Sequence, residues 1–273
     1  MSSVLVREPA VSNLFYPGDP EELRAMIKKF LDEAPLYNIK PEALASPHAG
    51  YIYSGPVAAV GYKQFLNLDR NKHYDVLLIG PSHYVPFEGL SFGYYDYWET
   101  PLGEVPVNKR RIEEFYLQYK DKLPITLNPL PHVKEHSLEV QVPFLQMVLN
   151  KFSLIPVVYG SVDYRIVELV IDYFKDDRDD TVVVISTDLS HYYPDDIAKS
   201  IDQYCNLAVE TLDIRYLEKC EACGMIGLKA IIEYAKLKGW KAKVLDYRTS
   251  GDTAGDRSAV VGYASYIFYK EGE

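Results

Sequence analysis

Short apolar runs alternate with longer amphipathic segments along this chain. The runs at 74–80 (YDVLLIG), 153–160 (SLIPVVYG) and 180–187 (DTVVVIST) are continuous in apolar residues, which is typical of strands buried on both faces. The segment at 19–34 (DPEELRAMIKKFLDEA) begins with a capping Asp19 and a proline at the first helical position, and then follows helical periodicity. The pattern therefore predicts strands that alternate with helices.

The same reading places further elements over the rest of the chain. Strands are predicted at 42–46, 241–249 and 259–269, with paired strands across 88–108; helices are predicted at 54–66, 108–122, 135–150, 164–176, 195–212 and 223–238. Helices between strands indicate crossover connections and a parallel or mixed sheet covered by helices on both faces. Pro143 lies inside a helical pattern and is expected to bend or restart that helix. No long Pro/Gly/Ser linker, repeat or low-complexity tract interrupts the pattern, so one domain over 1–273 is the simpler expectation.

Composition narrows the classes of protein that fit. Hydrophobic residues make up 48% and charged residues 25% of the chain, as in a well-packed globule. The charge of −10 is spread along the chain, which disfavours a nucleic-acid partner. No apolar run approaches the ~20 residues that span a bilayer, and the N-terminus lacks the features of a signal peptide, so we expect no membrane association. Three cysteines are too few and odd in number for a disulfide framework, which favours a cytoplasmic location, although thermophile cytosols can hold disulfides.

Three histidines follow the carboxyl ends of predicted core strands. His48 follows the strand at 42–46, His83 follows the run at 74–80, and His191 follows the run at 180–187. In open α/β sheets, ligand sites form at this edge. A single histidine after a strand is more often a hydrogen-bonded loop residue, but three of them indicate metal ligands or acid–base groups if the strands are neighbours. His73, by contrast, is expected to be a solvated loop residue.

Asp188 lies three residues before His191 in the sequence DLSH. At this spacing a carboxylate can orient an imidazole or share its proton, which would make the two residues an acid–base pair. The alternative is that Asp188 caps the turn that follows it. We favour a functional role for His191 and leave both roles open for Asp188.

Cys223 directly precedes Gly224 and an apolar helix. A thiol at a helix N-terminus is expected to have a lowered pKa, and its thiolate can serve as a soft metal ligand or a nucleophile. Cys220 and Cys223 also match C-x-x-C, which raises the alternative of a redox dithiol. A further alternative is that Cys223 is a small buried hydrophobe.

The segment HVKEH, from His132 to His136, matches the H-x-x-E-H pattern of inverted zinc peptidases. That chemistry needs both histidines on one face of an established helix. Pro129 and Pro131 place His132 at or outside the helix start, which disfavours a peptidase.

Side chains near these histidines are predicted to bind substrate. Glu135, His136 and Glu139 share one side of the predicted helix, and all three are expected to face the common site. Tyr51 and Ser82, which accompany His48 and His83 in their motifs, complete the predicted substrate-binding set.

Six ordered motifs resemble those of the MEMO family, which in bacteria and archaea is called AmmeMemoRadiSam system protein B. They are SPHAGYIYSGPVAA, GPSHY, KEHSLEVQVPFLQ, STDLSHY, ACGMIGLKAI and DRSAVVGYAS. The resemblance extends from about residue 5 to the C-terminus. It implies a three-layer α/β/α fold with a central mixed, largely parallel sheet, similar to the catalytic subunit of class III extradiol ring-cleaving dioxygenases.

The resemblance also implies roles for particular residues. Those dioxygenases hold non-haem iron(II) with two histidines and a carboxylate. By motif, His48 and His83 would be the histidine ligands, and Cys223 occupies the carboxylate position. His191 would match the acid–base histidine with Asp188 beside it, while Glu135 and His136 would line the same pocket.

Two hypotheses follow from this set of residues. The first is a protein with one transition-metal ion, iron or copper with zinc as a further candidate, that supports redox or oxygenase-like chemistry on a small molecule. The second is a non-catalytic binding or signalling protein that uses the dioxygenase-derived pocket for a peptide or metabolite. Family analogy adds a radical-SAM protein and an AMMECR-type protein as expected partners.

Overall fold

The computed structural model describes residues 3–272, which form twelve strands and nine α-helices with three short 3-10 helices. The strands are β1 (Val6–Arg7), β2 (Ala43–Ser46), β3 (His73–Pro81), β4 (Leu90–Phe92), β5 (Tyr97–Thr100), β6 (Gly103–Pro106), β7 (Ile125–Thr126), β8 (Lys151–Tyr159), β9 (Thr181–Ser186), β10 (His191–Tyr193), β11 (Lys241–Thr249) and β12 (Val260–Tyr269). The helices are α1 (Pro20–Glu33), α2 (Tyr51–Lys63), α3 (Lys109–Tyr119), α4 (Leu130–Val133), α5 (Val142–Val148), α6 (Tyr164–Lys175), α7 (Asp195–Thr211), α8 (Met225–Lys238) and α9 (Ser250–Ala254), with 3-10 turns η1 (Gln64–Asn67), η2 (Glu139–Gln141) and η3 (Ile214–Lys219).

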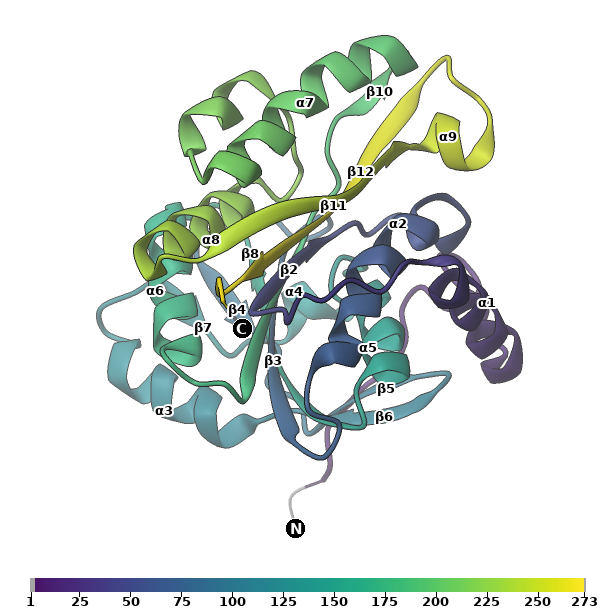
Figure 1. Ribbon diagram of the computed structural model, residues 1–273. Coiled ribbons are helices and arrows are strands. Elements are labelled where there is room, and N and C mark those ends of the chain that lie inside the picture. Colours follow the sequence, from purple (N-terminus) through teal and green to yellow (C-terminus); the bar gives the residue numbers. More distant parts are fainter. Residues whose placement is uncertain (1–2, 273) are drawn as a thin grey trace.

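A nine-stranded mixed sheet forms the centre of the molecule (Figure 1). Its strands follow the order β10-β12-β2-β9-β3-β8-β4-β7, and β11 pairs with β12. The four central strands β2, β9, β3 and β8 are parallel, whereas β12 and β4 run antiparallel to their central neighbours. In the centre, Leu77 of β3 aligns with Ile155 of β8 and Val183 of β9, and all three are fully buried. The continuous apolar runs are therefore explained by cover on both faces of the sheet.

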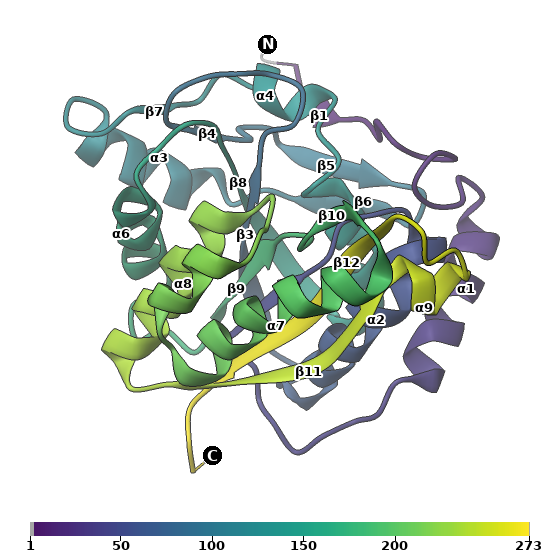
Figure 2. The ribbon, with the colours of Figure 1, turned by 90° about the horizontal axis from the view of Figure 1, so that it is seen from above.

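Helices cover both faces of this sheet, which confirms the predicted α/β/α layering (Figures 1 and 2). Helices α6, α7 and α8 lie on one face, and α1, α2 and α5 lie on the other. In α1, Asp19 accepts a hydrogen bond from the Glu21 amide, and Leu23, Ile27 and Leu31 form the buried stripe. Among the helices of residues 3–272, none has the length and the apolar character that crossing a bilayer demands.

The paired strands predicted across 88–108 belong to two different sheets. Strand β4 joins the large sheet by antiparallel pairing with β8. Strands β5 and β6 form the expected hairpin, with Gly103 at a φ of 122°, and β1 adds to β5 to complete a three-stranded sheet. The local pattern identified the hairpin correctly, but the partner of β4 lies more than sixty residues away and has no local signal.

The helix predicted at 135–150 is wrong over its first half. The chain forms the short helix α4, then an irregular stretch, and then η2, before α5 begins at Val142. The Glu135 carboxylate accepts hydrogen bonds from the backbone N–H groups of His136 and Ser137, at 3.0 and 2.9 Å, and so replaces helical partners. Pro143 lies in the first turn of α5, which confirms that it restarts the helix.

Cys205 and Cys220 form a disulfide that joins α7 to the end of η3. The odd number of cysteines therefore did not exclude a disulfide. The redox dithiol considered for Cys220 and Cys223 is wrong, because Cys220 is bonded to Cys205 and Cys223 is a free thiol.

Candidate metal centre

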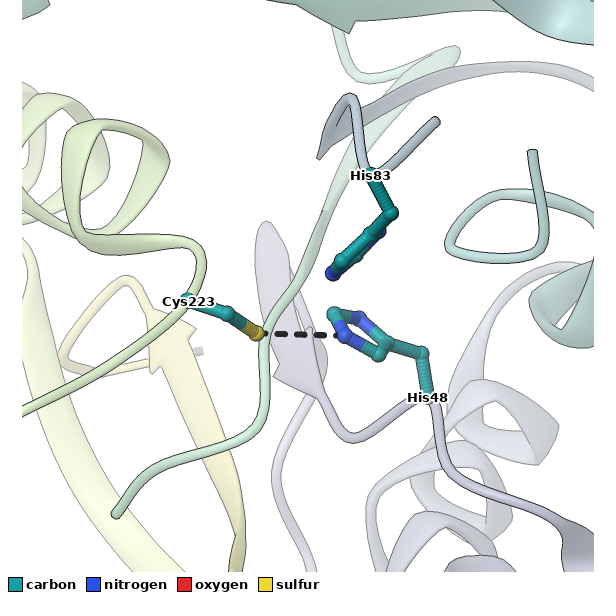
Figure 3. Close-up of side chains that lie close together, drawn as sticks. All are labelled: His48, His83 and Cys223. Carbon is teal, nitrogen blue, oxygen red and sulfur yellow. Dashed lines mark hydrogen bonds between the residues drawn. The ribbon is translucent and has the colours of Figure 1, made fainter. Parts of the chain in front are cut away.

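Three adjacent parallel strands bring polar side chains to one edge of the sheet. Strand β9 lies between β2 and β3, and all three strands end at this edge. His48 follows β2, His83 follows β3, and Asp188 follows β9. A fourth residue, Cys223, comes from the loop just before α8 and faces His48 and His83 (Figure 3). The assumption that these strands are neighbours is thus confirmed.

The side chains of His48, His83 and Cys223 point toward one another (Figure 3). Nε2 of His48 lies 3.1 Å from Sγ of Cys223, and the two imidazole centroids are 5.1 Å apart. One ligand atom from each residue lies within 4.8 Å of the others. Two imidazole nitrogens and a sulfur are ligand types that transition-metal ions bind in proteins. Their spacing would let one ion contact all three after small side-chain movements.

His48 is buried and held from two sides. Its backbone N–H donates to Oδ1 of Asp188 at 2.8 Å, and its Nδ1 lies 2.9 Å from Oγ of Ser186. Burial lowers the pKa of His48, because an imidazolium ion would lose its hydration there. The imidazole is therefore neutral and keeps a lone pair for a metal ion.

His83 is oriented by Glu135. Its Nδ1 lies 2.8 Å from Oε2 of Glu135, and its backbone N–H donates to Oε1 of the same carboxylate. Burial opposes ionisation of Glu135, but hydrogen bonds from His83 and from the Ser137 amide outweigh it and lower the pKa of Glu135 to about 2. An ionised carboxylate only accepts hydrogen bonds, so Nδ1 carries the proton and Nε2 of His83 is available as a ligand.

His136 forms the wall of the site beside His83. The two imidazole centroids are 4.4 Å apart, and His83, Glu135 and His136 form a second group with ligand-type atoms within 4.8 Å. The ring of Phe15 stacks on His136 at 4.7 Å, and the Tyr84 hydroxyl lies 3.0 Å from its Nδ1. Burial lowers the pKa of His136 to about 4, so this ring is also neutral at physiological pH.

Cys223 does not have the lowered pKa that its position before a helix led us to expect. Burial and the nearby charge of Asp188 raise the pKa of the thiol to about 12. The backbone N–H groups of Asp188 and Gly224 and the Thr187 hydroxyl favour the thiolate, but they do not offset burial. The Asp188 N–H donates to the sulfur at 3.3 Å. Without a bound ion, the side chain is therefore a thiol at neutral pH.

Asp188 lies between two imidazoles. Its Oδ2 is 3.9 Å from Nε2 of His191 and 3.8 Å from Nε2 of His48. Its Oδ1 accepts from the His48 amide, and among the hydrogen bonds of residues 3–272 neither carboxylate oxygen accepts from the turn that follows. The Asp188 carboxylate raises the pKa of His191, whose side chain is 39% exposed. His191 is thus the solvent-facing member of the pair.

Two residues of the predicted substrate-binding set direct their hydroxyls elsewhere. Tyr51 is buried, and its hydroxyl donates to the Val140 carbonyl at 2.5 Å. The Ser82 hydroxyl donates to the Val85 carbonyl at 2.6 Å. Both hydroxyls stabilise backbone segments around the site.

His132 and Glu139 lie apart from the cluster. Nε2 of the buried His132 donates to the Ser91 carbonyl at 2.8 Å, and within residues 3–272 His132 joins neither metal-capable group. Glu139 forms a buried salt bridge of 2.6 Å with Arg7. The peptidase arrangement is therefore absent, and Glu139 does not share a side with Glu135 and His136, because the helix that would align them does not form.

Sequence reasoning missed Ser186 and Gln141. Both are buried and hydrogen-bonded to each other at 3.0 Å beside His48. Each is a polar residue in an otherwise apolar stretch, TVVVIS or EVQVPF. A buried polar side chain needs a hydrogen-bond partner, so a polar residue in an apolar stretch indicates a buried hydrogen bond.

A family model and the sequences of related proteins point to the same family. The family model for Memo-like protein matches residues 7–267. A MEMO1 family protein of Aquifex aeolicus is 37% identical over 96% of this chain and 99% of its own length. MEMO1 family proteins of Archaeoglobus fulgidus and Thermotoga neapolitana are 34% and 36% identical, again over 96% of this chain and 99% of theirs.

Proposed function

The chain belongs to the MEMO family, and from that premise we propose that it binds one transition-metal ion through His48, His83 and Cys223. The observation that carries the proposal is the convergence of two imidazoles and one sulfur within 4.8 Å at the edge of the sheet. A set of two nitrogens and a thiolate is softer than two histidines with a carboxylate. It suits copper(I), zinc or iron.

We propose that the bound ion supports redox or oxygenase-like chemistry on a small molecule. The ion would act as a Lewis acid or an electron carrier, and the chain would supply the proton. His191 is the candidate acid–base group, because its side chain is exposed and Asp188 stabilises its charged form. Glu135 acts through His83 as a positioning residue, and His136 forms a neutral wall.

Metal analysis of protein purified without chelator tests the proposal. We expect about one ion per chain for the wild type and loss of most of it in His48→Ala and Cys223→Ala, since two ligands cannot hold the ion as tightly as three. His73→Ala is the matched control, because His73 begins β3, its side chain is 52% exposed, and its ring hydrogen-bonds Ser153 of β8. Stoichiometric metal that survives both substitutions would contradict the proposal.

A binding protein without turnover is the second candidate function. Exposed aromatic rings that border the site favour it, and the motif resemblance, by which Cys223 would take the place of a dioxygenase carboxylate, agrees with it. Tyr84 is 51% and Tyr192 is 75% exposed, beside His136 and His191 respectively. If the wild type consumes oxygen with a catechol-like substrate and His191→Ala does not, the protein is not solely a binding protein. Saturable binding of the same molecule without turnover would support this candidate.

A further inference from the structure

We propose that Ser186 and Gln141 are positioning residues that fix the proton of His48 on Nδ1 and leave Nε2 as its metal-binding nitrogen. The inference deepens the proposed function and relies on it for the identity of the ligand site. It is carried by a chain of buried hydrogen bonds whose donors and acceptors can be assigned from chemistry alone.

The chain begins at the amide of Gln141, whose orientation is fixed by two partners. Its Nε2 donates to the Pro47 carbonyl at 2.9 Å, and a carbonyl can only accept. Its Oε1 accepts from the Tyr62 hydroxyl at 2.6 Å. The Ser46 carbonyl lies farther from Nε2, at 3.4 Å, so the second N–H of the amide donates to Oγ of Ser186, 3.0 Å away.

The hydroxyl of Ser186 has its own proton committed elsewhere. Its Oγ lies 2.6 Å from the Ser137 carbonyl, which again can only accept, so Ser186 donates there. The oxygen already accepts one hydrogen bond from Gln141 and has one lone pair left. Nδ1 of His48, 2.9 Å away, must supply the proton for that contact.

The opposite tautomer of His48 would break this chain. A lone pair on Nδ1 would need the Ser186 proton, and the Ser137 carbonyl would then lose that hydrogen bond. Ser186, Gln141, Ser137 and Tyr62 are all buried, so the alternative arrangement has little access to water that could replace the lost partner. The network consequently holds the lone pair of Nε2 toward Cys223, 3.1 Å away.

The two metal-binding imidazoles are thus oriented by different means. His83 donates its Nδ1 proton to the ionised Glu135, while His48 donates to a neutral hydroxyl. A neutral acceptor suits His48, because Asp188 already lies 3.8 Å from its Nε2. A second carboxylate beside this ring would favour the imidazolium ion, which cannot bind a metal.

Nitrogen-15 NMR of the metal-free wild type tests the assignment directly. We expect His48 to show a protonated Nδ1 and an unprotonated Nε2, with a slowly exchanging Nδ1 proton. Detection of His48 with its proton on Nε2 would overturn the proposal. This measurement needs no variant and no metal, so it remains decisive even if the metal site itself is disproved.

Ser186→Ala tests the consequence for metal binding. Removing the acceptor should let the second tautomer appear in the NMR spectrum and weaken binding of Zn²⁺ or Co²⁺ about ten- to a hundredfold, measured by chelator competition. Ser265→Ala is the matched control, because this buried serine donates its side-chain hydrogen bond to the Val57 carbonyl and not to a site residue. Thermal unfolding of both variants reports any general loss of stability.

The outcomes separate the two proposals. Unchanged tautomer and unchanged metal affinity in a folded Ser186→Ala protein would overturn the positioning role. Equal weakening by Ser265→Ala would also overturn it, because the effect would then be a general one. If the wild type binds no metal but shows the expected tautomer, the proposed function fails while the assignment of the proton stands.

Discussion

At the scale of single residues, burial and nearby charge decide the protonation of the Cys223 thiol, not its position before a helix. Cys223 occupies a position that favours a thiolate, yet burial and the charge of Asp188 keep it protonated. A metal ion would have to displace that proton. The affinity of the site for metal should therefore depend on pH.

We predict that metal binding strengthens as the pH rises. The pKa of the Cys223 thiol is about 12 in the metal-free protein, so at neutral pH each bound ion releases one thiol proton, and Kd should fall about tenfold per pH unit. Chelator-competition titrations at several pH values near neutrality would measure the slope. Cys223→Ala is the control and should lose that dependence. An affinity of the wild type that does not change with pH would contradict the prediction.

At the scale of elements, two connections place the site's loops. The stretch between α4 and η2 is irregular because Glu135 takes its backbone N–H groups, and this lets Glu135 reach His83. The turn before Cys223 is tied to α7 by the disulfide and to β10 by a hydrogen bond of 2.7 Å between Tyr193 and Glu221. Both loops are thus held by side-chain contacts and not by the backbone hydrogen bonds of a helix or strand.

We predict that the disulfide contributes measurably to stability. Replacing Cys205 and Cys220 together by alanine should lower the free energy of unfolding by about 3 kcal/mol, the value expected for a bond that closes a 15-residue loop. Urea unfolding measures the change. Wild-type protein in a strong reductant is the parallel sample and should fall by a similar amount. No difference between oxidised and reduced wild type would show that the bond does not contribute.

At the scale of the whole molecule, the N-terminal segment is joined to a region more than 120 residues away. Arg7 is buried, forms the salt bridge to Glu139, and donates to the carbonyls of His132 and Glu135. The other oxygen of Glu139 accepts from the Tyr16 hydroxyl at 2.7 Å. Through these contacts the start of the chain supports the backbone that carries Glu135 and His136.

We predict that Glu139→Ala destabilises the protein by about 3–5 kcal/mol, since it leaves the Arg7 charge buried without its partner. Urea unfolding measures the loss. Glu8→Ala is the matched control, because Glu8 is exposed and its removal should change stability by about 0.5 kcal/mol or less. If the two substitutions lower the free energy of unfolding by similar amounts, the salt bridge between Arg7 and Glu139 has no special importance for stability.

Much of the fold and part of the site could be predicted because their signals are local. The continuous apolar runs of β3, β8 and β9, and the capped stripe of α1, each lie within a few consecutive residues. The position of His48 and His83 after strand ends is also local. The pairing of β4 with β8, the disulfide and the proton on His48 depend on partners distant in sequence, which no local pattern records.

The sequence by itself determined the alternation of strands and helices and the edge of the sheet where polar residues gather, because hydrophobic periodicity acts over short distances. Only the tertiary structure decided that β2, β9 and β3 are neighbours, that Cys223 meets His48, and that Glu139 turns away from the site. It also decided the protonation of Cys223, since burial and charge depend on what surrounds a residue in space. The physical reason is that packing and electrostatics act through distance, not through order along the chain.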